Sequence, residues 1–313
     1  MTQVAVASRS FSRDTRLREE LLARHPGARF NMTGRTLKGE ELVDFLRGHE
    51  AAITGLERLD EALFRAVPEL RVVSKYGVGL DMIDLEAARR CGVAVRWTPG
   101  VNRQAVAELA VAMMIMLGRK MLPLARETAS GLWHQPVGRQ LSSATVGIVG
   151  CGHVGKRVAE ICRAIGSAVV VHDIVSYEGF YAAHGVRAVS LDALLREADI
   201  VTLHVPLDAS TRGMIGAREI AAMKGSAFLL NTARGGIVDE AALKRALVEG
   251  RIGGAAFDVY ATEPPTDHEL LQLPNVLPLP HIGASTDESV LAMGRAAIEG
   301  LSNPFREIAL SKS

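Results

Sequence analysis

A glycine-rich turn between a strand-like and a helix-like segment constrains this chain most. The apolar stretch Thr145–Val149 is followed by Gly150-Cys-Gly152-His-Val-Gly155, and the amphipathic pattern after it predicts a helix over Val154–Ile165. A second apolar stretch, Ala168–His172, comes next and leads directly to Asp173. A strand, a G-x-G-x-x-G turn, a helix and a second strand in this order are typical of an α/β unit that binds a dinucleotide.

Each glycine of this turn has an expected task. Gly150 would allow the tight turn, Gly152 would let the backbone approach a pyrophosphate, and Gly155 would let the helix pack closely on the strand. The pyrophosphate would lie at the helix N-terminus, where free N–H groups and the helix dipole favour an anion. Asp173 can accept hydrogen bonds from both ribose hydroxyls and would repel a 2′-phosphate, and no arginine follows it directly. The sequence therefore predicts NAD, rather than NADP, as the cofactor.

Strand-like and helix-like segments alternate along the whole chain, which predicts an α/β fold with two doubly wound domains. In the first hundred residues we expect strands over Gln3–Ala7, Ala51–Thr54, Arg71–Ser74 and Val93–Arg96, and helices over Arg13–Ala23, Gly39–Leu46, Asp60–Ala66 and Ile83–Arg89. Further along we expect six strands, Thr145–Val149, Ala168–His172, Ile200–His204, Ala227–Asn231, Ala255–Val259 and Val276–Leu279, with a helix over Glu240–Glu249. Six strands with crossover helices are typical of a nucleotide-binding sheet.

The domain boundary is predicted at Thr98-Pro99-Gly100, where the pattern breaks before a long helix over Arg103–Lys120. The final helix, Thr286–Leu301, is expected to cross back to the first domain. The predicted substrate domain therefore comprises residues 1–98 and 286–313, and the predicted NAD-binding domain comprises residues 99–285.

Composition and charge narrow the partners. Apolar residues make up 48% of the chain, charged residues 23%, and the net charge is +1, so neither nucleic acid nor an anionic membrane is an expected partner. The most apolar segment, Val106–Gly118, is too short to span a bilayer. Cys91, Cys151 and Cys162 have neither metal-ligand nor disulfide spacing, so we expect no metal and a cytoplasmic location.

Three polar residues follow three separate predicted strands. Arg234 lies after the strand that ends at Asn231, Glu263 lies in the loop after Val259, and His281 follows the last strand. Ligands of open parallel sheets bind beyond the carboxyl ends of the strands, so these side chains are candidates for catalysis.

Their chemistry suits the interconversion of a hydroxy acid and a keto acid. His281 would exchange the proton, Glu263 would hold the other ring nitrogen and raise the imidazole pKa, and Arg234 would bind the substrate carboxylate. Asp258 is a candidate to hold the nicotinamide amide. Each residue also has a structural alternative: a core histidine, a solvated arginine, a glutamate in a surface turn, and an aspartate that caps a strand end.

The chain resembles the D-isomer-specific 2-hydroxyacid dehydrogenases, especially their phosphoglycerate-dehydrogenase-like branch. The motifs that carry the resemblance span Ser74–Asp81, Gly150–Gly155, His204–Leu207, Asn231–Asp239, Asp258–Pro264 and Pro280–Thr286. The resemblance implies a Rossmann NAD-binding domain, a smaller flavodoxin-like substrate domain, a homodimer with the long helix after Asn102 near its interface, and Arg234, Glu263 and His281 as the catalytic set.

Together with the glycine motif, the resemblance predicts these cofactor contacts: Gly150, Gly152, His153, Val154, Gly155, Asp173, His204, Val205, Pro206, Thr232, Ala233, Arg234, Asp258, His281, Gly283 and Ala284. The predicted substrate contacts are Lys75, Val78, Gly79 and Arg234.

The natural substrate stays open at this point. Phosphoglycerate dehydrogenases typically carry Arg-Ser where this chain has Thr54-Gly55, and threonine where it has Val78; the nearest cations here are Arg58 and Lys75. We therefore expect a D-2-hydroxy/2-keto acid pair, with a generic or phosphoglycerate-type substrate first and glyoxylate or hydroxypyruvate second. A binding protein that senses NADH, like the related transcriptional corepressors, is the alternative from another class.

Overall fold

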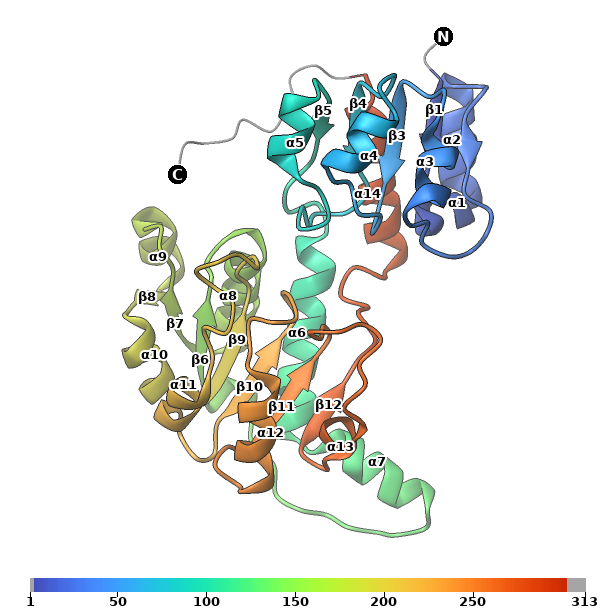
Figure 1. The fold of residues 1–313 in the computed structure, drawn as a ribbon. Helices are drawn as coiled ribbons and strands as arrows, with labels where there is room; N and C mark the ends of the chain where they lie inside the picture. Colours follow the sequence, from blue (N-terminus) through green and yellow to red (C-terminus); the bar gives the residue numbers. More distant parts are fainter. Residues whose placement is uncertain (1–2, 303–313) are drawn as a thin grey trace. The chain divides into compact units, whose positions relative to one another are not determined.

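The computed structural model describes residues 3–302 and divides them into two compact units (Figure 1). One unit comprises residues 103–284, and the other comprises residues 3–102 together with 285–302. The boundaries predicted from the sequence lay between residues 98 and 99 and between 285 and 286. Residues 1–2 and 303–313 of the predicted ranges lie outside the described residues.

The first unit is built on a five-stranded parallel sheet. Its strands are β1 (Val4–Val6), β2 (Arg29–Phe30), β3 (Ala51–Thr54), β4 (Val72–Lys75) and β5 (Ala94–Arg96). Their spatial order is β2-β1-β3-β4-β5, the order of flavodoxin-like folds. The order reverses between β1 and β3, and this switch point is where such sheets bind ligands. The sequence analysis did not predict β2, because two residues carry no periodic pattern.

Helices cover both faces of this sheet. On one face lie α3 (Glu40–Leu46), α4 (Glu61–Ala66) and α5 (Leu85–Arg90), whose apolar side chains share a buried core with the strands. On the other lie α1 (Arg9–Arg13), α2 (Thr15–Arg24) and α14 (Asp287–Gly300). The helix predicted over Arg13–Ala23 corresponds to α2, which begins at Thr15 because Asp14 caps it by accepting a hydrogen bond from the Leu17 amide at 3.1 Å. The short helix α1 was not predicted.

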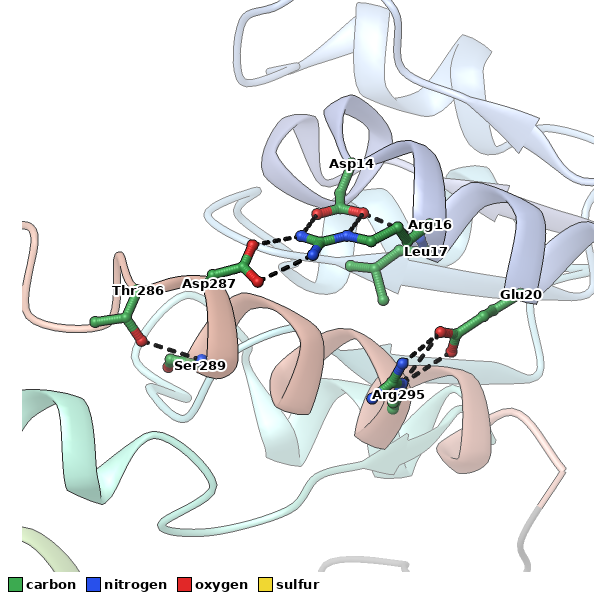
Figure 2. A network of polar contacts seen from close by, with 8 residues as sticks. All are labelled: Asp14, Arg16, Leu17, Glu20, Thr286, Asp287, Ser289 and Arg295. Carbon is green, nitrogen blue, oxygen red and sulfur yellow. Dashed lines mark hydrogen bonds and ion pairs between the residues drawn. The ribbon is translucent and has the colours of Figure 1, made fainter.

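Helix α14 belongs to the first unit because it packs against α2 (Figure 2). Leu17 lies so close to Gly294 that a Cβ on this glycine would be 2.3 Å from the leucine side chain. Around this contact, Arg16 binds Asp287 with both terminal nitrogens, at 2.5 and 2.9 Å, and Arg295 binds Glu20. These ion pairs are exposed and stabilise little by themselves, so close packing holds the helix.

The second unit contains a parallel sheet of seven strands. They are β6 (Thr145–Val149), β7 (Ala168–His172), β8 (Arg187–Ala188), β9 (Ile200–Leu203), β10 (Phe228–Asn231), β11 (Gly254–Phe257) and β12 (Val276–Pro278). Their order, β12-β11-β10-β9-β6-β7-β8, is the doubly wound order of a Rossmann sheet with one strand added. The predicted number of six was too small: β8 pairs with β7 at the sheet edge, where both of its residues are exposed.

Helices also cover both faces of this second sheet. One core lies under α6 (Arg103–Gly118), α8 (His153–Ile165) and α9 (Glu178–His184), and the other under α10 (Leu191–Glu197), α11 (Ala217–Ala222) and α12 (Glu240–Val248). Helix α13 (His268–Gln272) contacts β12, and α7 (Met121–Ala129) contacts the end of α6. Among the described residues, no helix is both long and apolar enough to cross a membrane.

Candidate functional site

The predicted cofactor and catalytic residues of the second unit gather beyond the carboxyl ends of its strands. Gly150 to Gly155 follow β6, Asp173 follows β7, and His204 to Pro206 follow β9. Thr232 to Arg234 follow β10, Asp258 and Glu263 follow β11, and His281 to Ala284 follow β12. Strands β6 and β9 are neighbours at the switch point of this sheet. The sheet therefore brings together, along one edge, residues as far apart in the chain as Gly150 and Ala284.

The glycine turn leaves room at the N-terminus of α8. Gly150 has a φ of +94°, and a Cβ on it would lie 2.7 Å from the His204 carbonyl oxygen. A Cβ on Gly155 would lie 2.0 Å from the Gly150 oxygen, so the helix can start this close only with glycine there. Gly152, in contrast, faces open space, and no side chain caps the helix. The free N–H groups of the first helical turn can thus receive a phosphate.

Asp173 is held in a fixed orientation directly after β7. Its Oδ2 accepts a hydrogen bond from the Cys151 amide at 2.5 Å, and its Oδ1 accepts one from the Val175 amide at 2.8 Å. The carboxylate thus connects the end of the second strand with the glycine turn. Each carboxylate oxygen has a further lone pair, which can accept a ribose hydroxyl.

Two polar side chains beyond the carboxyl ends of β9 and β10 can form hydrogen bonds with a ligand. The Thr232 hydroxyl is buried and has no hydrogen-bond partner within residues 3–302, an arrangement that costs free energy until a ligand or water supplies one. Burial lowers the pKa of His204 to about 3, so its ring stays neutral, with Nε2 3.0 Å from the Thr202 hydroxyl. Together with the open helix N-terminus, these groups fit a dinucleotide.

The loop after β10 is shaped by Asn231, whose role the sequence analysis did not predict. Its amide nitrogen donates to the Arg234 carbonyl at 2.8 Å, and its amide oxygen accepts from the Ala233 N–H at 3.1 Å. An asparagine that binds the backbone two residues further on is a known turn former, so the signal was present in the sequence. Asn231 thereby sets the path of the segment that carries Arg234.

Glu263 and His281 form a hydrogen-bonded pair. Glu263 Oε2 lies 2.8 Å from His281 Nδ1, and Glu263 Oε1 accepts from the Tyr260 amide at 3.1 Å. This contact leaves Nε2 of the imidazole for other partners. The carboxylate and the ring thus form an ordered acid/base unit of the kind that proton transfer requires.

The electrostatics of the pair follow from this contact. The hydrogen bond to Glu263 raises the pKa of His281, against burial and the positive charge of Arg234, which lower it. Burial alone would raise the pKa of Glu263, but His281, the Tyr260 amide and the charge of Arg234 together outweigh burial and lower it. The pKa changes of both partners therefore favour an ion pair. The positive charge of Arg234 acts on both residues.

Asp258 holds the backbone of the loop that carries His281. Its two oxygens accept hydrogen bonds from the Ile282 and Gly283 amides, both at 2.7 Å. Burial raises the pKa of Asp258, and these two amides oppose the rise. His281 itself has a φ of +56°, which is uncommon for a residue other than glycine and requires support from its surroundings. The alternative reading of Asp258 as a cap thus has direct structural support, and its contact with nicotinamide stays a prediction.

A close backbone contact joins the loops of Arg234 and Glu263. A Cβ on Gly235 would lie 1.8 Å from the Tyr260 carbonyl oxygen, so only glycine fits next to Arg234. The Tyr260 hydroxyl donates to the Leu279 carbonyl at 2.9 Å, two residues before His281. Tyr260 therefore contacts all three catalytic loops, a role that no local sequence pattern indicates.

The predicted substrate residues of the first unit lie at the carboxyl end of β4. Lys75 is the last residue of this strand and is 5% exposed, and its ammonium donates to the Gly55 carbonyl. Val78 and Gly79 follow in the next loop, where the Val78 carbonyl accepts from the Trp97 indole at 2.9 Å. Binding of substrate by these residues stays a prediction. Within residues 3–302, no three histidine, cysteine, aspartate or glutamate side chains are placed to hold a metal ion.

The fold and the site define a dinucleotide-dependent oxidoreductase. Residues 111–283 match the family model described as "D-isomer specific 2-hydroxyacid dehydrogenase, NAD binding domain". The chain thus belongs to the D-isomer-specific 2-hydroxyacid dehydrogenases, NAD-dependent enzymes that interconvert 2-hydroxy acids and 2-keto acids. The resemblance and the fold class predicted from the sequence are confirmed.

Relatives with different substrates are about equally similar to the chain. A D-3-phosphoglycerate dehydrogenase of Archaeoglobus fulgidus is 38% identical over 84% of this chain, which spans only 51% of that relative. A hydroxypyruvate reductase of Thermotoga maritima is 36% identical over 89% of this chain and 91% of its own length. A glyoxylate reductase of Korarchaeum cryptofilum is 38% identical over 83% of this chain and 81% of its own length. Identity alone therefore does not select a substrate.

A solved structure of a relative has the same overall architecture as this chain. A crystal structure of a D-lactate dehydrogenase from Aquifex aeolicus, complexed with NAD and lactic acid, matches with a TM-score of 0.86. It is 28% identical, and the match covers 96% of this chain and 94% of that one.

Proposed function

We propose that this protein reduces a small 2-keto acid to the D-2-hydroxy acid, and catalyses the reverse oxidation, with His281 as the acid/base. The observation that carries the proposal is the 2.8 Å contact between His281 Nδ1 and Glu263, close to the charge of Arg234. The reaction requires that the substrate carboxylate is bound and that one proton and one hydride are transferred. NAD(H), when bound, supplies the site that accepts or gives the hydride.

The catalytic residues divide the remaining work. Because Nδ1 is engaged by Glu263, Nε2 of His281 is the atom that donates a proton to the keto oxygen in reduction and removes the hydroxyl proton in oxidation. Glu263 stabilises the imidazolium and keeps the ring in one orientation. Arg234 binds the substrate carboxylate with its guanidinium fork and polarises the carbonyl.

The cofactor would lie along the carboxyl edge of the second sheet. Its pyrophosphate would contact the amides after Gly152, including those of His153 and Val154, and Asp173 would accept the ribose hydroxyls. The remaining predicted contacts would line the edge towards His281. The Thr232 hydroxyl, buried without a partner, would gain one there.

A panel of keto acids tests the proposal. Purified protein is mixed with NADH and, in turn, glyoxylate, hydroxypyruvate, 3-phosphohydroxypyruvate and pyruvate, and the loss of nicotinamide absorbance is followed. We expect turnover of at least one acid, and the D-isomer as the product wherever the reduction creates a stereocentre, as it does with every acid of the panel except glyoxylate. Tight NADH binding without turnover of any acid would refute the enzyme and favour a protein that senses NADH.

We also propose that the protein is a cytoplasmic homodimer. Its three cysteines are free, as is usual in a reducing compartment.

Segment 121–138 forms an excursion that begins and ends at the C-terminus of α6, where the Arg139 amide donates a hydrogen bond to the Gly118 carbonyl at 2.9 Å. Helix α7 in this segment has no buried residue, and Trp133 and Val137 are 81% and 94% exposed. Large exposed apolar groups on one segment favour an interface between subunits.

Sedimentation measurements test the dimer. We expect the wild type to sediment as a dimer and Trp133→Ser with Val137→Ser to shift it towards the monomer. Val248→Ser is the control, since Val248 is also exposed (65%) but lies on α12. A monomeric wild type at micromolar concentration would contradict the dimer.

A further inference from the structure

A tryptophan side chain is hydrogen-bonded to the loop that follows β4 in the first unit. Trp97 comes directly after β5, the edge strand that pairs with β4, and its indole N–H donates to the Val78 carbonyl at 2.9 Å. Both residues are half-buried. The side chain of Trp97 thus connects the segments that follow two neighbouring strands at the carboxyl edge of the sheet.

The loop that receives this hydrogen bond has free backbone donors. The N–H groups of Gly77, Val78 and Gly79 reach no acceptor within residues 3–302. Gly77 has a φ of +108°, and a Cβ on it would meet no atom within 4 Å, so the turn faces open space at this point. Consecutive free N–H groups of the backbone can bind an anion such as a carboxylate. This supports the predicted substrate contacts at Val78 and Gly79.

The hydrogen bond from Trp97 fixes the orientation of one of these donors. The peptide group between Val78 and Gly79 is planar and trans, so its N–H points opposite to its C=O. With the C=O directed at the indole, the Gly79 N–H points away from Trp97. Glycine has few backbone restrictions, so without this contact the peptide could rotate and turn its N–H elsewhere. A donor on the C=O also polarises the peptide group and strengthens its N–H as a donor.

We propose that Trp97 is a positioning residue for the substrate: its indole holds the Val78–Gly79 peptide in the orientation in which the Gly79 N–H binds the carboxylate of the keto acid. The inference rests on the proposed function and adds to it a residue outside the predicted substrate contacts. The carboxylate does not react, so this contact stabilises the bound substrate and the transition state alike. Its loss should therefore raise KM and leave kcat nearly unchanged.

Two substitutions separate the hydrogen bond from the bulk of the indole. Trp97→Phe keeps an aromatic ring but has no N–H. Trp97→His loses the benzene ring of the indole and keeps a donor, because Nε2 of imidazole has the same position in a five-membered ring as the indole nitrogen. At about pH 8 an ordinary histidine is neutral, so this variant adds no charge.

The assay is steady-state reduction, at saturating NADH, of the keto acid that the wild type reduces fastest. In Trp97→Phe, KM should rise about three- to tenfold, the range over which a hydrogen bond of ordinary strength favours one orientation of a peptide. In Trp97→His, KM should stay close to the wild-type value. The affinity for NADH should be the same in all three proteins, and thermal melts show whether the variants are folded.

The wild type offers a second test, because the chain has only two tryptophans. Protein labelled with nitrogen-15 in tryptophan gives two indole N–H signals in NMR spectra, and the signal that is lost in Trp133→Phe belongs to Trp133. With NADH bound, we add oxamate, an unreactive analogue of a keto acid, at a concentration that inhibits turnover. The Trp97 signal should shift, because the indole is bonded to the peptide group that takes up the carboxylate.

Three results would overturn the proposal. The first is a folded Trp97→Phe protein with the wild-type KM, and the second is an equal rise of KM in Trp97→His, which would assign the effect to bulk. The third is an unchanged Trp97 signal in the wild type, which decides the case even if neither variant folds. Each of these results leaves the proposed function intact, whereas a wild type that reduces no keto acid would refute the proposed function and this inference together.

Discussion

Replacing Glu263 by glutamine separates two tasks of this residue, because glutamine can still accept a hydrogen bond from His281 but carries no charge. The partner atoms lie 2.8 Å apart, and the histidine and glutamate side chains are 40% and 39% exposed. Solvent screens such a pair strongly, so we use the dielectric constant of water. Coulomb's law then gives about 1.5 kcal/mol, which corresponds to a decrease of about one unit in the pKa of His281.

The sign of the effect follows from the proton that His281 must carry. Reduction of the keto acid needs the imidazolium, so its rate falls as the pH rises through the raised pKa of His281. Without the carboxylate, the fall should begin about one pH unit lower. Oxidation needs the neutral imidazole, and its rising limb should move to lower pH by the same amount.

The assay is the pH dependence of kcat/KM for the keto acid at saturating NADH. Glu240→Gln is the matched control, since Glu240 accepts the Ala261 amide at 2.7 Å in the same loop without contacting His281. An unchanged midpoint in Glu263→Gln, or an equal shift in Glu240→Gln, would refute the electrostatic role of Glu263.

Three further predictions concern other parts of the site. His281→Ala should abolish turnover and leave the affinity for NADH, measured by fluorescence titration, almost unchanged; a fully active variant would show that another group transfers the proton. Asp173→Ala should weaken the preference for NAD over NADP, because it removes the carboxylate that the Cys151 amide orients, and an unchanged ratio of kcat/KM values would contradict a contact with ribose. Gly235→Ala should lower the free energy of unfolding by about 1–3 kcal/mol and reduce kcat, because the new Cβ would lie 1.8 Å from the Tyr260 carbonyl oxygen. Wild-type stability and activity in that variant would show that the two loops can move apart at little cost.

Much of the fold was predictable because its signals are local. The strands β6 and β7 were predicted with their observed bounds, since buried parallel strands are continuous apolar runs between turn residues. The short edge strand β8 has two exposed residues and no such run, so only its pairing with β7 reveals it. The start of α2 was predicted two residues too early, although Asp14 is of a residue type that commonly caps helices, and the five-residue helix α1 was missed because it is too short to carry a periodic pattern.

The candidate site was predictable as a set of strand ends. Parallel strands bring their carboxyl ends to one edge, so Arg234, Glu263 and His281 could be grouped without knowing any distance. Asn231 was within reach of the same reasoning, because its turn chemistry is local. Gly235 and Tyr260 were not, since their contact depends on how two loops, far apart in the sequence, pack.

The sequence by itself thus determined the glycine turn, the acid after β7, the family and the order of the elements, because these depend on residue types at short spacings. The tertiary structure alone decided how the loops meet. It paired Glu263 with one ring nitrogen of His281 and placed both Asp258 oxygens on the amides that follow that histidine. These contacts join residues from separate loops, and such contacts are not encoded in a local pattern. The contact with Glu263 is also what raises the pKa of His281.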